Sequence, residues 1–209
     1  MATLVYIRHG DKQHHNHARG VDYAYDSALS RKDLKQMQEL VRELVKEHGT
    51  PTQIICSPFE RCRETALILR LFLGYEEADV DDLEDIADEI QDTRIPEPYA
   101  EESPTVEIKV DRYIGEYFGN LDTVDMSEIR SETHPESIFV DRNTNGLKVR
   151  VNKHLRYMSS HVREDDVIWL ITHGSVISAI SKSIQRTVGI TRRHTPTLGH
   201  IVVPQHALI

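Results

Sequence analysis

Short, almost continuously apolar runs alternate with longer stretches of helical periodicity, and this alternation restricts the chain to few folds. Apolar runs over 3–7, 53–56 and 167–171 indicate buried strands. Two further strands are predicted over 106–110 and 201–203. Near-continuous apolar strands are typical of parallel sheets that helices cover on both faces. The sequence therefore predicts an α/β fold of three α/β/α layers around a mostly parallel central sheet.

Four helices are predicted from apolar stripes at helical spacing. Their ranges are 30–48, 60–73, 147–162 and the stretch 176–184. No internal repeat or flexible linker interrupts the sequence, so residues 1–209 are expected to form a single domain. A chain of 209 residues can bury a sizeable core without disulfides or a structural metal.

Charge is distributed very unevenly along the chain. The formal net charge of −9, from 34 acidic and 25 basic residues, argues against nucleic acid or an anionic membrane surface as partner. Segment 76–103, however, holds 13 acidic residues and only one basic residue, Arg94. The rest of the chain has 24 basic and 21 acidic residues, so its charge is slightly positive. We therefore expect segment 76–103 to form an acidic surface on a slightly basic body.

The cysteines and the N-terminal residues indicate in which cellular compartment the protein is expected. Cys56 and Cys62 lie six residues apart in an apolar strand-to-helix stretch, which favours packed, reduced thiols over a reactive or bridged pair. The apolar run at 1–7 is too short for a secretory signal, and no run reaches the roughly 18 residues of a membrane span. The expectation is a cytoplasmic protein that does not enter a membrane.

Two of the predicted strands end in the same dipeptide, His9-Gly10 and His173-Gly174. In an open α/β sheet, ligands bind beyond the carboxyl ends of the strands, and a glycine there lets the backbone approach a ligand. Arg8 precedes the first pair, and Arg61 lies one turn into the helix after a third strand. Arginine matches phosphate oxygens with a fork of donors and stays charged. Both arginines and both histidines are thus predicted to converge on one anion.

At these residues the sequence resembles the histidine phosphatase superfamily, branch 1, also called phosphoglycerate-mutase-like. The family's Arg-His-Gly is residues 8–10, its Ser-Pro-x-x-Arg-x-x-x-Thr-Ala segment is 57–66, and its late His-Gly is 173–174. Residues 110–117 are most similar to two-histidine phosphatases of the suppressor-of-T-cell-receptor-signalling and ecdysteroid-phosphate type. The likeness covers nearly the whole chain, and it implies the fold and the phosphate pocket of that family.

The resemblance also implies a catalytic role for each matched residue. His9 would attack phosphorus and form a phosphohistidine, while Arg8, Arg61 and His173 would hold the phosphoryl oxygens without a metal. The leaving group needs a proton, and Glu116 in Ile114-Gly115-Glu116 matches the family's Leu-x-Glu segment. The alternative acids are Asp111 and a residue of 76–103.

Further substrate contacts are expected around the first histidine and at both glycines. The residues concerned are Gly10, Lys12, Asn16 and Gly174. For Lys12 the alternative is a loop lysine that faces solvent. The histidines within 14–17 suggest a metal site, but adjacent side chains of an extended loop point apart, and a polar rim of the pocket is favoured. Neither a metal nor another cofactor is expected.

The resulting functional hypothesis is a phosphatase that hydrolyses a phosphomonoester of a small molecule or a phosphoprotein. A phosphoglycerate-mutase-type phosphotransferase and a non-catalytic binding protein on the same fold are the alternatives. Mutases of this family are usually longer through 122–146, where this chain has room only for a modest excursion or lid, and this favours hydrolysis. The expected partner is the phosphorylated substrate, and a homodimer would match the habit of the superfamily.

Overall fold

A computed structural model describes most of the chain, in five stretches: residues 1–12, 29–74, 106–116, 144–188 and 197–208. The predictions made for segment 76–103, for Asn16 and for the histidines within 14–17 lie outside the described residues. The same holds for the predicted excursion over 122–146, except for its last three residues.

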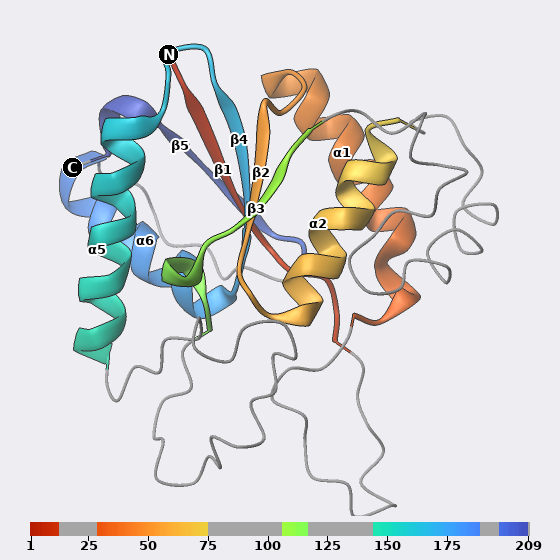
Figure 1. The fold of residues 1–209 in the computed structure, drawn as a ribbon, viewed down its shortest axis with the longest axis horizontal. Helices are drawn as coiled ribbons and strands as arrows, with labels where there is room; N and C mark the ends of the chain where they lie inside the picture. Colours follow the sequence, from red (N-terminus) through yellow and green to blue (C-terminus); the bar gives the residue numbers. More distant parts are fainter. Residues whose placement is uncertain (13–28, 75–105, 117–143, 189–196, 209) are drawn as a thin grey trace, which may run out of the picture.

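The centre of the fold is a five-stranded sheet with the order β3-β2-β4-β1-β5 (Figure 1). Its strands are β1 (Thr3–Arg8), β2 (Gln53–Cys56), β3 (Ile108–Val110), β4 (Val167–Thr172) and β5 (His200–Pro204). The first four run parallel, and β5 runs antiparallel to β1. The prediction of a mostly parallel sheet is confirmed, and each strand lies within two residues of its predicted bounds.

Helices cover both faces of this sheet. On one face lie α1 (Leu34–His48) and α2 (Glu60–Phe72), and on the other lie α5 (Thr144–His161) and α6 (Gly174–Val188), as Figure 1 shows. Three layers are thus confirmed. The structure starts α5 three residues before the predicted position, because its first turn is polar and lacks the apolar spacing on which the prediction relied.

The alternation of side chains along β1 explains why its sequence is apolar throughout. Val5 and Ile7 pack into the core beneath α1 and α2, whereas Leu4 and Tyr6 pack into the core beneath α5 and α6. Side chains on both faces of β1 are therefore buried beneath helices, so the strand is apolar at successive positions.

Local sequence determines where the first helix begins and ends. The predicted helix at Ser30 starts as a 3-10 turn, η2 (Arg31–Asp33), in which the Ser30 hydroxyl accepts from the amide of Lys32, and α1 follows. Gly49 ends α1 with a φ of 85°, a backbone conformation that L side chains rarely adopt.

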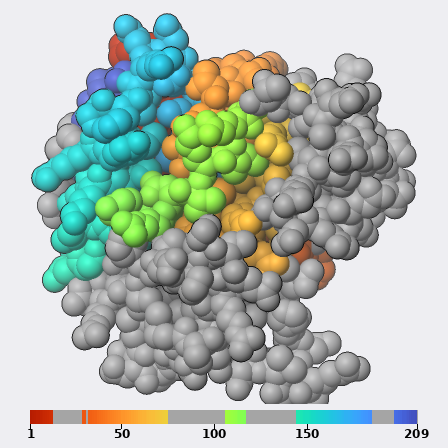
Figure 2. All heavy atoms as spheres, in the orientation of Figure 1, coloured from red at the N-terminus to blue at the C-terminus, as the bar shows by residue number. Residues whose placement is uncertain are grey.

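Residues 106–116 carry the chain from the sheet edge toward the site. They hold β3 and a second 3-10 turn, η3 (Arg112–Ile114), and they lie at the surface between α5 and the β2–α2 region (Figure 2). The chain closes with a third 3-10 turn, η7 (Gln205–Ala207).

The expectations for the cysteines and for membrane-spanning helices can be compared with the structure. Cys56 and Cys62 are free thiols and buried, as predicted. Within the described residues, no helix combines the length and the apolar character that crossing a membrane requires.

Candidate active site

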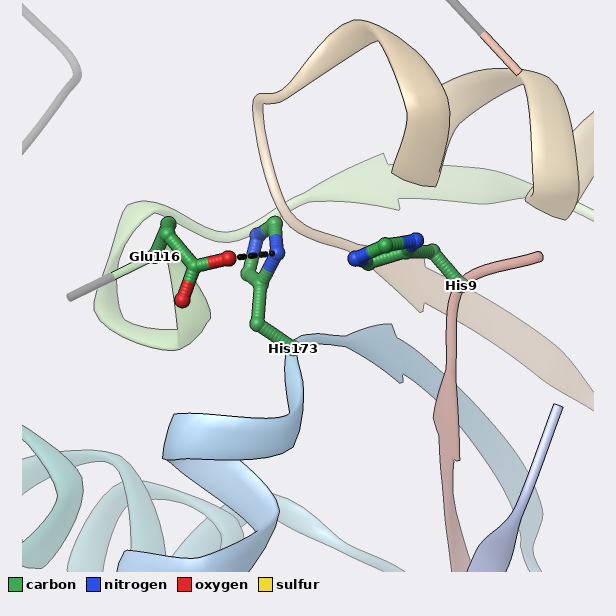
Figure 3. Close-up of side chains that lie close together, drawn as sticks. All are labelled: His9, Glu116 and His173. Carbon is green, nitrogen blue, oxygen red and sulfur yellow. Dashed lines mark ion pairs between the residues drawn. The ribbon is translucent and has the colours of Figure 1, made fainter. Parts of the chain in front are cut away.

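The two histidines meet because their strands are parallel neighbours. Arg8 pairs with Thr172 at the ends of β1 and β4, so the next residue of each strand, His9 and His173, leaves the sheet at the same edge. The amide of His9 donates to the Thr172 carbonyl at 2.9 Å. The two rings then stand edge to face, with centroids 5.1 Å apart (Figure 3). The predicted convergence of the two His-Gly pairs is what the structure contains.

His9 is held in one tautomer by its own backbone. Its Nδ1 lies 2.6 Å from the Gly10 carbonyl oxygen, and because a carbonyl can only accept, Nδ1 carries the proton. The lone pair is therefore on Nε2, which accepts from Nε of Arg61 at 3.3 Å. Burial, with the neighbouring His173 and Arg61, holds the pKa of His9 well below its ordinary value of 6.5. The ring is thus neutral at neutral pH, with Nε2 able to act as a nucleophile.

His173 uses both ring nitrogens in contacts with side chains. Nδ1 lies 2.9 Å from Oε2 of Glu116, and Nε2 lies 2.8 Å from the Ser57 hydroxyl. With the proton on Nδ1, the ring donates to the carboxylate and accepts from the hydroxyl. Burial lowers the pKa of His173, and the Glu116 carboxylate opposes that change. The ring of Phe59 packs edge to face against it, with centroids 5.0 Å apart.

Arg61 connects the nucleophile with the carboxylate. It lies in the first turn of α2, is 4% exposed, and donates from Nε to His9 and from Nη2 to Oε2 of Glu116 at 3.2 Å. Its guanidinium stacks 4.8 Å from the centroid of the Phe59 ring. Thr65, one turn further, donates to the Arg61 carbonyl at 2.6 Å and accepts from the Gly10 amide at 3.2 Å. The helix start is thereby tied to the loop after His9.

Glu116 is a half-buried carboxylate whose contacts in this structure keep it ionised. Its Oε1 accepts from the Ser175 hydroxyl at 2.7 Å, and its Oε2 lies between His173 and Arg61. Burial alone would raise the pKa of Glu116, but His173, Arg61 and Ser175 outweigh it and hold that pKa well below its ordinary value. In Figure 3 the His173 ring lies between Glu116 and His9. Glu116 and His9 thus lie on opposite sides of the His173 ring.

The other predicted contact residues differ in their surroundings. A Cβ at Gly174 would stand 3.5 Å from Nε and 3.7 Å from Cζ of Arg8, so the Arg8 side chain lies beside the start of α6. A Cβ at Gly10 would overlap the Met37 side chain and come within 2.9 Å of Leu29. Gly10 is therefore needed for core packing, whereas the sequence suggested only close approach to a ligand.

Lys12 is exposed, and its backbone forms an isolated bridge with Leu29. Its role in substrate binding stays a prediction, as does that of Asn16.

Asp111, the alternative acid, has different surroundings from Glu116. Asp111 accepts from the Tyr113 amide at 2.7 Å with Oδ1, and its Oδ2 lies 2.8 Å from Nδ1 of His154. It lines a groove of about 730 Å³ between β3 and α5, and neither His9 nor His173 borders that groove. Among the residues that the structure describes, Glu116 is the carboxylate that lies beside the two histidines.

Several residues of the site were not predicted from the sequence. They are Ser57, Phe59, Cys62, Thr65, Arg150 and Ser175. The first four lie inside the 57–66 motif, so the motif itself was a signal for them, whereas nothing comparable marked Arg150 or Ser175. The Cys62 sulfur lies 3.4 Å from Nε2 of His173, and burial raises the pKa of that thiol well above its ordinary value. Cys62 is therefore a neutral neighbour of the ring.

The arrangement suits an oxyanion better than a cation. Within the described part of the chain, His9, Glu116 and His173 form a group whose potential metal-ligating atoms lie within 4.8 Å of one another. The Arg61 guanidinium already contacts two of these atoms, Nε2 of His9 and Oε2 of Glu116. A metal ion there would have to displace a buried positive charge, whereas a phosphoryl group would find donors in place.

Comparisons with known proteins show which family and which solved structures the chain is similar to. The family model of the histidine phosphatase superfamily (branch 1) matches residues 4–197. Similar solved structures include a mycobacterial glucosyl-3-phosphoglycerate phosphatase (17% identity, 88% of this chain and 79% of that chain, TM-score 0.53). A phosphoserine phosphatase mutant from Entamoeba histolytica in complex with phosphoserine is 12% identical (97% and 90%, TM-score 0.54). The ecdysone phosphate phosphatase from Bombix mori in complex with tungstate is 14% identical (97% and 88%, TM-score 0.52). No curated protein matches the chain.

Proposed function

The chain belongs to the histidine phosphatase superfamily (branch 1), and from this we propose that it hydrolyses phosphomonoesters through a phosphohistidine on His9. The observation that carries the proposal is the state of His9. Its ring is neutral, its Nδ1–H donates to the Gly10 carbonyl, and its Nε2 lone pair faces Nε of Arg61. A small phosphorylated metabolite or a phosphoprotein would supply the phosphoryl group.

Substrate binding requires an exchange of anions in the pocket. The phosphoryl oxygens would take Arg61, His173 and Arg8 as partners, and so would compete with Glu116 for the first two. Glu116 would then lose its cationic contacts and stand beside a second negative charge. Both changes raise the pKa of a carboxyl group, so Glu116 would take up a proton when substrate binds. Substrate binding would thus protonate the carboxyl group that then serves as the acid.

The first chemical step transfers the phosphoryl group to the protein. Nε2 of His9 forms a bond to phosphorus as the bond from phosphorus to the leaving oxygen breaks. The Gly10 carbonyl stabilises the positive charge that develops on the ring, since it accepts a hydrogen bond from Nδ1–H. Arg61 and His173 stabilise the phosphoryl oxygens, and Glu116 gives its proton to the leaving oxygen.

The second step returns the protein to its starting state. A water molecule attacks phosphorus, the bond from phosphorus to Nε2 breaks, and the Glu116 carboxylate accepts a proton from that water. The sum of both steps consumes one water and yields an alcohol or phenol and inorganic phosphate. His9 recovers the lone pair with which it began.

Hydrolysis of 4-nitrophenyl phosphate between pH 5 and 8 tests this proposal. We expect turnover by the wild type, a loss of about 10³-fold or more in His9→Ala, and no change in His161→Ala. His161 makes a matched control because it is an exposed histidine at the far end of α5. Undiminished hydrolysis by His9→Ala would contradict the proposal. Transfer of the phosphoryl group to 3-phosphoglycerate in preference to water would indicate the mutase alternative.

A further inference from the structure

We propose that Arg150 and His154 of α5 are positioning residues that place Glu116 against the phosphate pocket. This inference rests on the proposed role of Glu116 as the acid. The segment that carries Glu116, residues 111–116, packs on α5, and the two side chains lie one turn apart on the same face of that helix. Both are buried, although one is an arginine and the other an ionisable ring.

Arg150 donates to three main-chain carbonyls of the segment that carries Glu116. It is 4% exposed, and its Nη1 donates to the carbonyls of Tyr113 at 2.8 Å and Gly115 at 2.9 Å. Its Nη2 donates to the carbonyl of Glu116 at 3.4 Å. A guanidinium has a planar fork of donors, so three acceptors on one rigid group keep a fixed relation to one another. The backbone of Glu116 is thereby fixed to α5.

His154 anchors the other end of the segment. Its Nδ1 lies 2.8 Å from Oδ2 of Asp111, and its Nε2 lies 3.0 Å from the hydroxyl of Tyr6 in β1. Burial, with the nearby Asp111, raises the pKa of Tyr6, so the hydroxyl keeps its proton and donates to Nε2. Nδ1 therefore carries a proton and donates to Asp111, which in turn accepts from the Tyr113 amide. A chain of hydrogen bonds thus runs from the central sheet to the start of η3.

A third contact ties the segment to the strand end that carries His173. The Thr172 hydroxyl donates to the Ile114 carbonyl at 2.6 Å. Together with the contacts of Arg150, four successive carbonyls, from Tyr113 to Glu116, accept from buried side chains. Such a set of contacts fixes the backbone at Glu116 relative to His173.

Loss of this support would affect the acid selectively. The nucleophile and Arg61 come from β1 and α2, and α2 covers the opposite face of the sheet from α5. A displacement of about 1 Å at a reacting group can cost on the order of 100-fold in rate. Phosphoryl transfer to His9 would suffer most with substrates whose leaving group needs a proton, because these substrates alone need Glu116 as an acid in that step.

A series of aryl phosphates tests the proposal, since phenyl and 4-nitrophenyl phosphate differ little in shape but greatly in leaving-group basicity. For Arg150→Met we expect kcat/KM, which reports phosphoryl transfer to His9, to fall about 30-fold on phenyl phosphate and less than about threefold on 4-nitrophenyl phosphate. Arg150→Lys should recover part of the loss, because it keeps a donor in place. The matched control Arg156→Met, the same change at an exposed position of α5, should leave both rates unchanged.

A double-mutant cycle shows whether Arg150 acts through Glu116. In a Glu116→Gln background, Arg150→Met should cost less than about threefold on phenyl phosphate, because the acid is already absent. Full additivity, or equal losses on the two substrates, would overturn the inference and leave the phosphatase proposal standing. A wild type without hydrolysis of any aryl phosphate would instead overturn the proposed function.

Thermal unfolding would show whether Arg150→Met folds. If it does not, two milder variants can still test the inference. Tyr6→Phe removes a single oxygen, so Nε2 of His154 loses its donor while the core keeps its shape. We expect Tyr6→Phe and Arg150→Lys to lower the ratio of phenyl to 4-nitrophenyl phosphate turnover by about threefold. An unchanged ratio in both variants would overturn the inference.

Discussion

The same dipeptide, His-Gly, follows two neighbouring parallel strands, yet its two copies have different surroundings. His9 donates a hydrogen bond from Nδ1 to a main-chain carbonyl, and its Nε2 accepts one from Nε of Arg61. His173 has one nitrogen against Glu116 and the other against Ser57. In the proposed mechanism the Nε2 lone pair of His9 attacks phosphorus, and His173 stabilises the phosphoryl charge. The contacts of each ring, rather than the motif, indicate its role.

The two glycines differ in the same way. Gly10 borders the core, where a Cβ would meet Met37 and Leu29. Gly174 borders the site, where a Cβ would make ordinary contacts with Arg8. One position is restricted by packing, and the other lies beside a residue that we propose binds substrate.

The largest expected difference is between the alanine variants of the two histidines. His9→Ala removes the nucleophile and should leave no covalent phosphoenzyme. His173→Ala should lower kcat by roughly 10²-fold while a phosphoenzyme still forms, because Arg61 and the nucleophile remain. Rapid-quench assays with 4-nitrophenyl phosphate measure both properties. If neither variant formed a phosphoenzyme, the distinction between the two rings would be lost.

The next prediction concerns the carboxylate that contacts His173. Glu116→Gln should lower kcat on phenyl phosphate about 100-fold, because the leaving oxygen loses its proton donor. The same variant should bind inorganic phosphate roughly tenfold more tightly, since an anion no longer competes for Arg61 and His173. Competitive inhibition and calorimetry test the second effect, with Glu107→Gln, at an exposed glutamate of the same region, as control. Weaker phosphate binding by Glu116→Gln would contradict the exchange of anions.

The histidines should also make stability depend on pH. Both have a pKa below the ordinary 6.5 in the folded protein, so the unfolded chain binds more protons once the pH falls below about 6.5. The free energy of unfolding should therefore decrease on acidification, by up to about 1.4 kcal/mol per pH unit for each ring. Glu116 has a lowered pKa, so its contribution is lost only at more acidic pH, below about 4.5.

Urea unfolding at pH 7.0 and 5.5 measures that dependence. His9→Gln should reduce the difference between the two pH values, and so should His173→Gln to a similar or smaller extent, because Glu116 partly opposes the shift of His173. His161→Gln, at an exposed position, is the control. A free energy of unfolding that rises on acidification would show that the two rings are not buried in their neutral form.

The last expected difference is between the two glycines. Gly10→Ala should lower the free energy of unfolding by about 1–3 kcal/mol, because the new methyl group overpacks the core. Gly174→Ala should change it by less than about 0.5 kcal/mol. Met37→Ala in the Gly10→Ala background should recover part of the loss, since it removes the nearest side chain. Equal effects of the two glycine substitutions in thermal or urea unfolding would contradict this difference.

Much of the fold could be predicted because the relevant signals are local. Apolar runs mark strands, and an open sheet collects ligands at the carboxyl ends of its strands, so the meeting of His9 and His173 followed from sequence. The packing that requires a glycine at position 10 could not be predicted, because Met37, the side chain that restricts it, comes from α1. A local sequence pattern indicates that a side chain is buried, but it does not show which side chain packs against it.

Arg150 and His154 illustrate the same limit. Each immediately precedes an apolar residue of the inward stripe of α5, Val151 and Leu155, so a burial signal was present in the sequence. Their partners are carbonyls and a carboxylate of segment 111–116, which lies more than 30 residues earlier. Only the packing of α5 on the sheet makes those contacts visible.

The most direct test of this account is the location of the phosphoryl group during turnover. The protein is mixed with excess 4-nitrophenyl phosphate, quenched in alkali, digested, and mapped by mass spectrometry. The account predicts a phosphoryl group on Nε2 of His9, formed in a burst of nitrophenolate of about one equivalent. A phosphoryl group on His173 or on another residue, or turnover without any covalent intermediate, would contradict it.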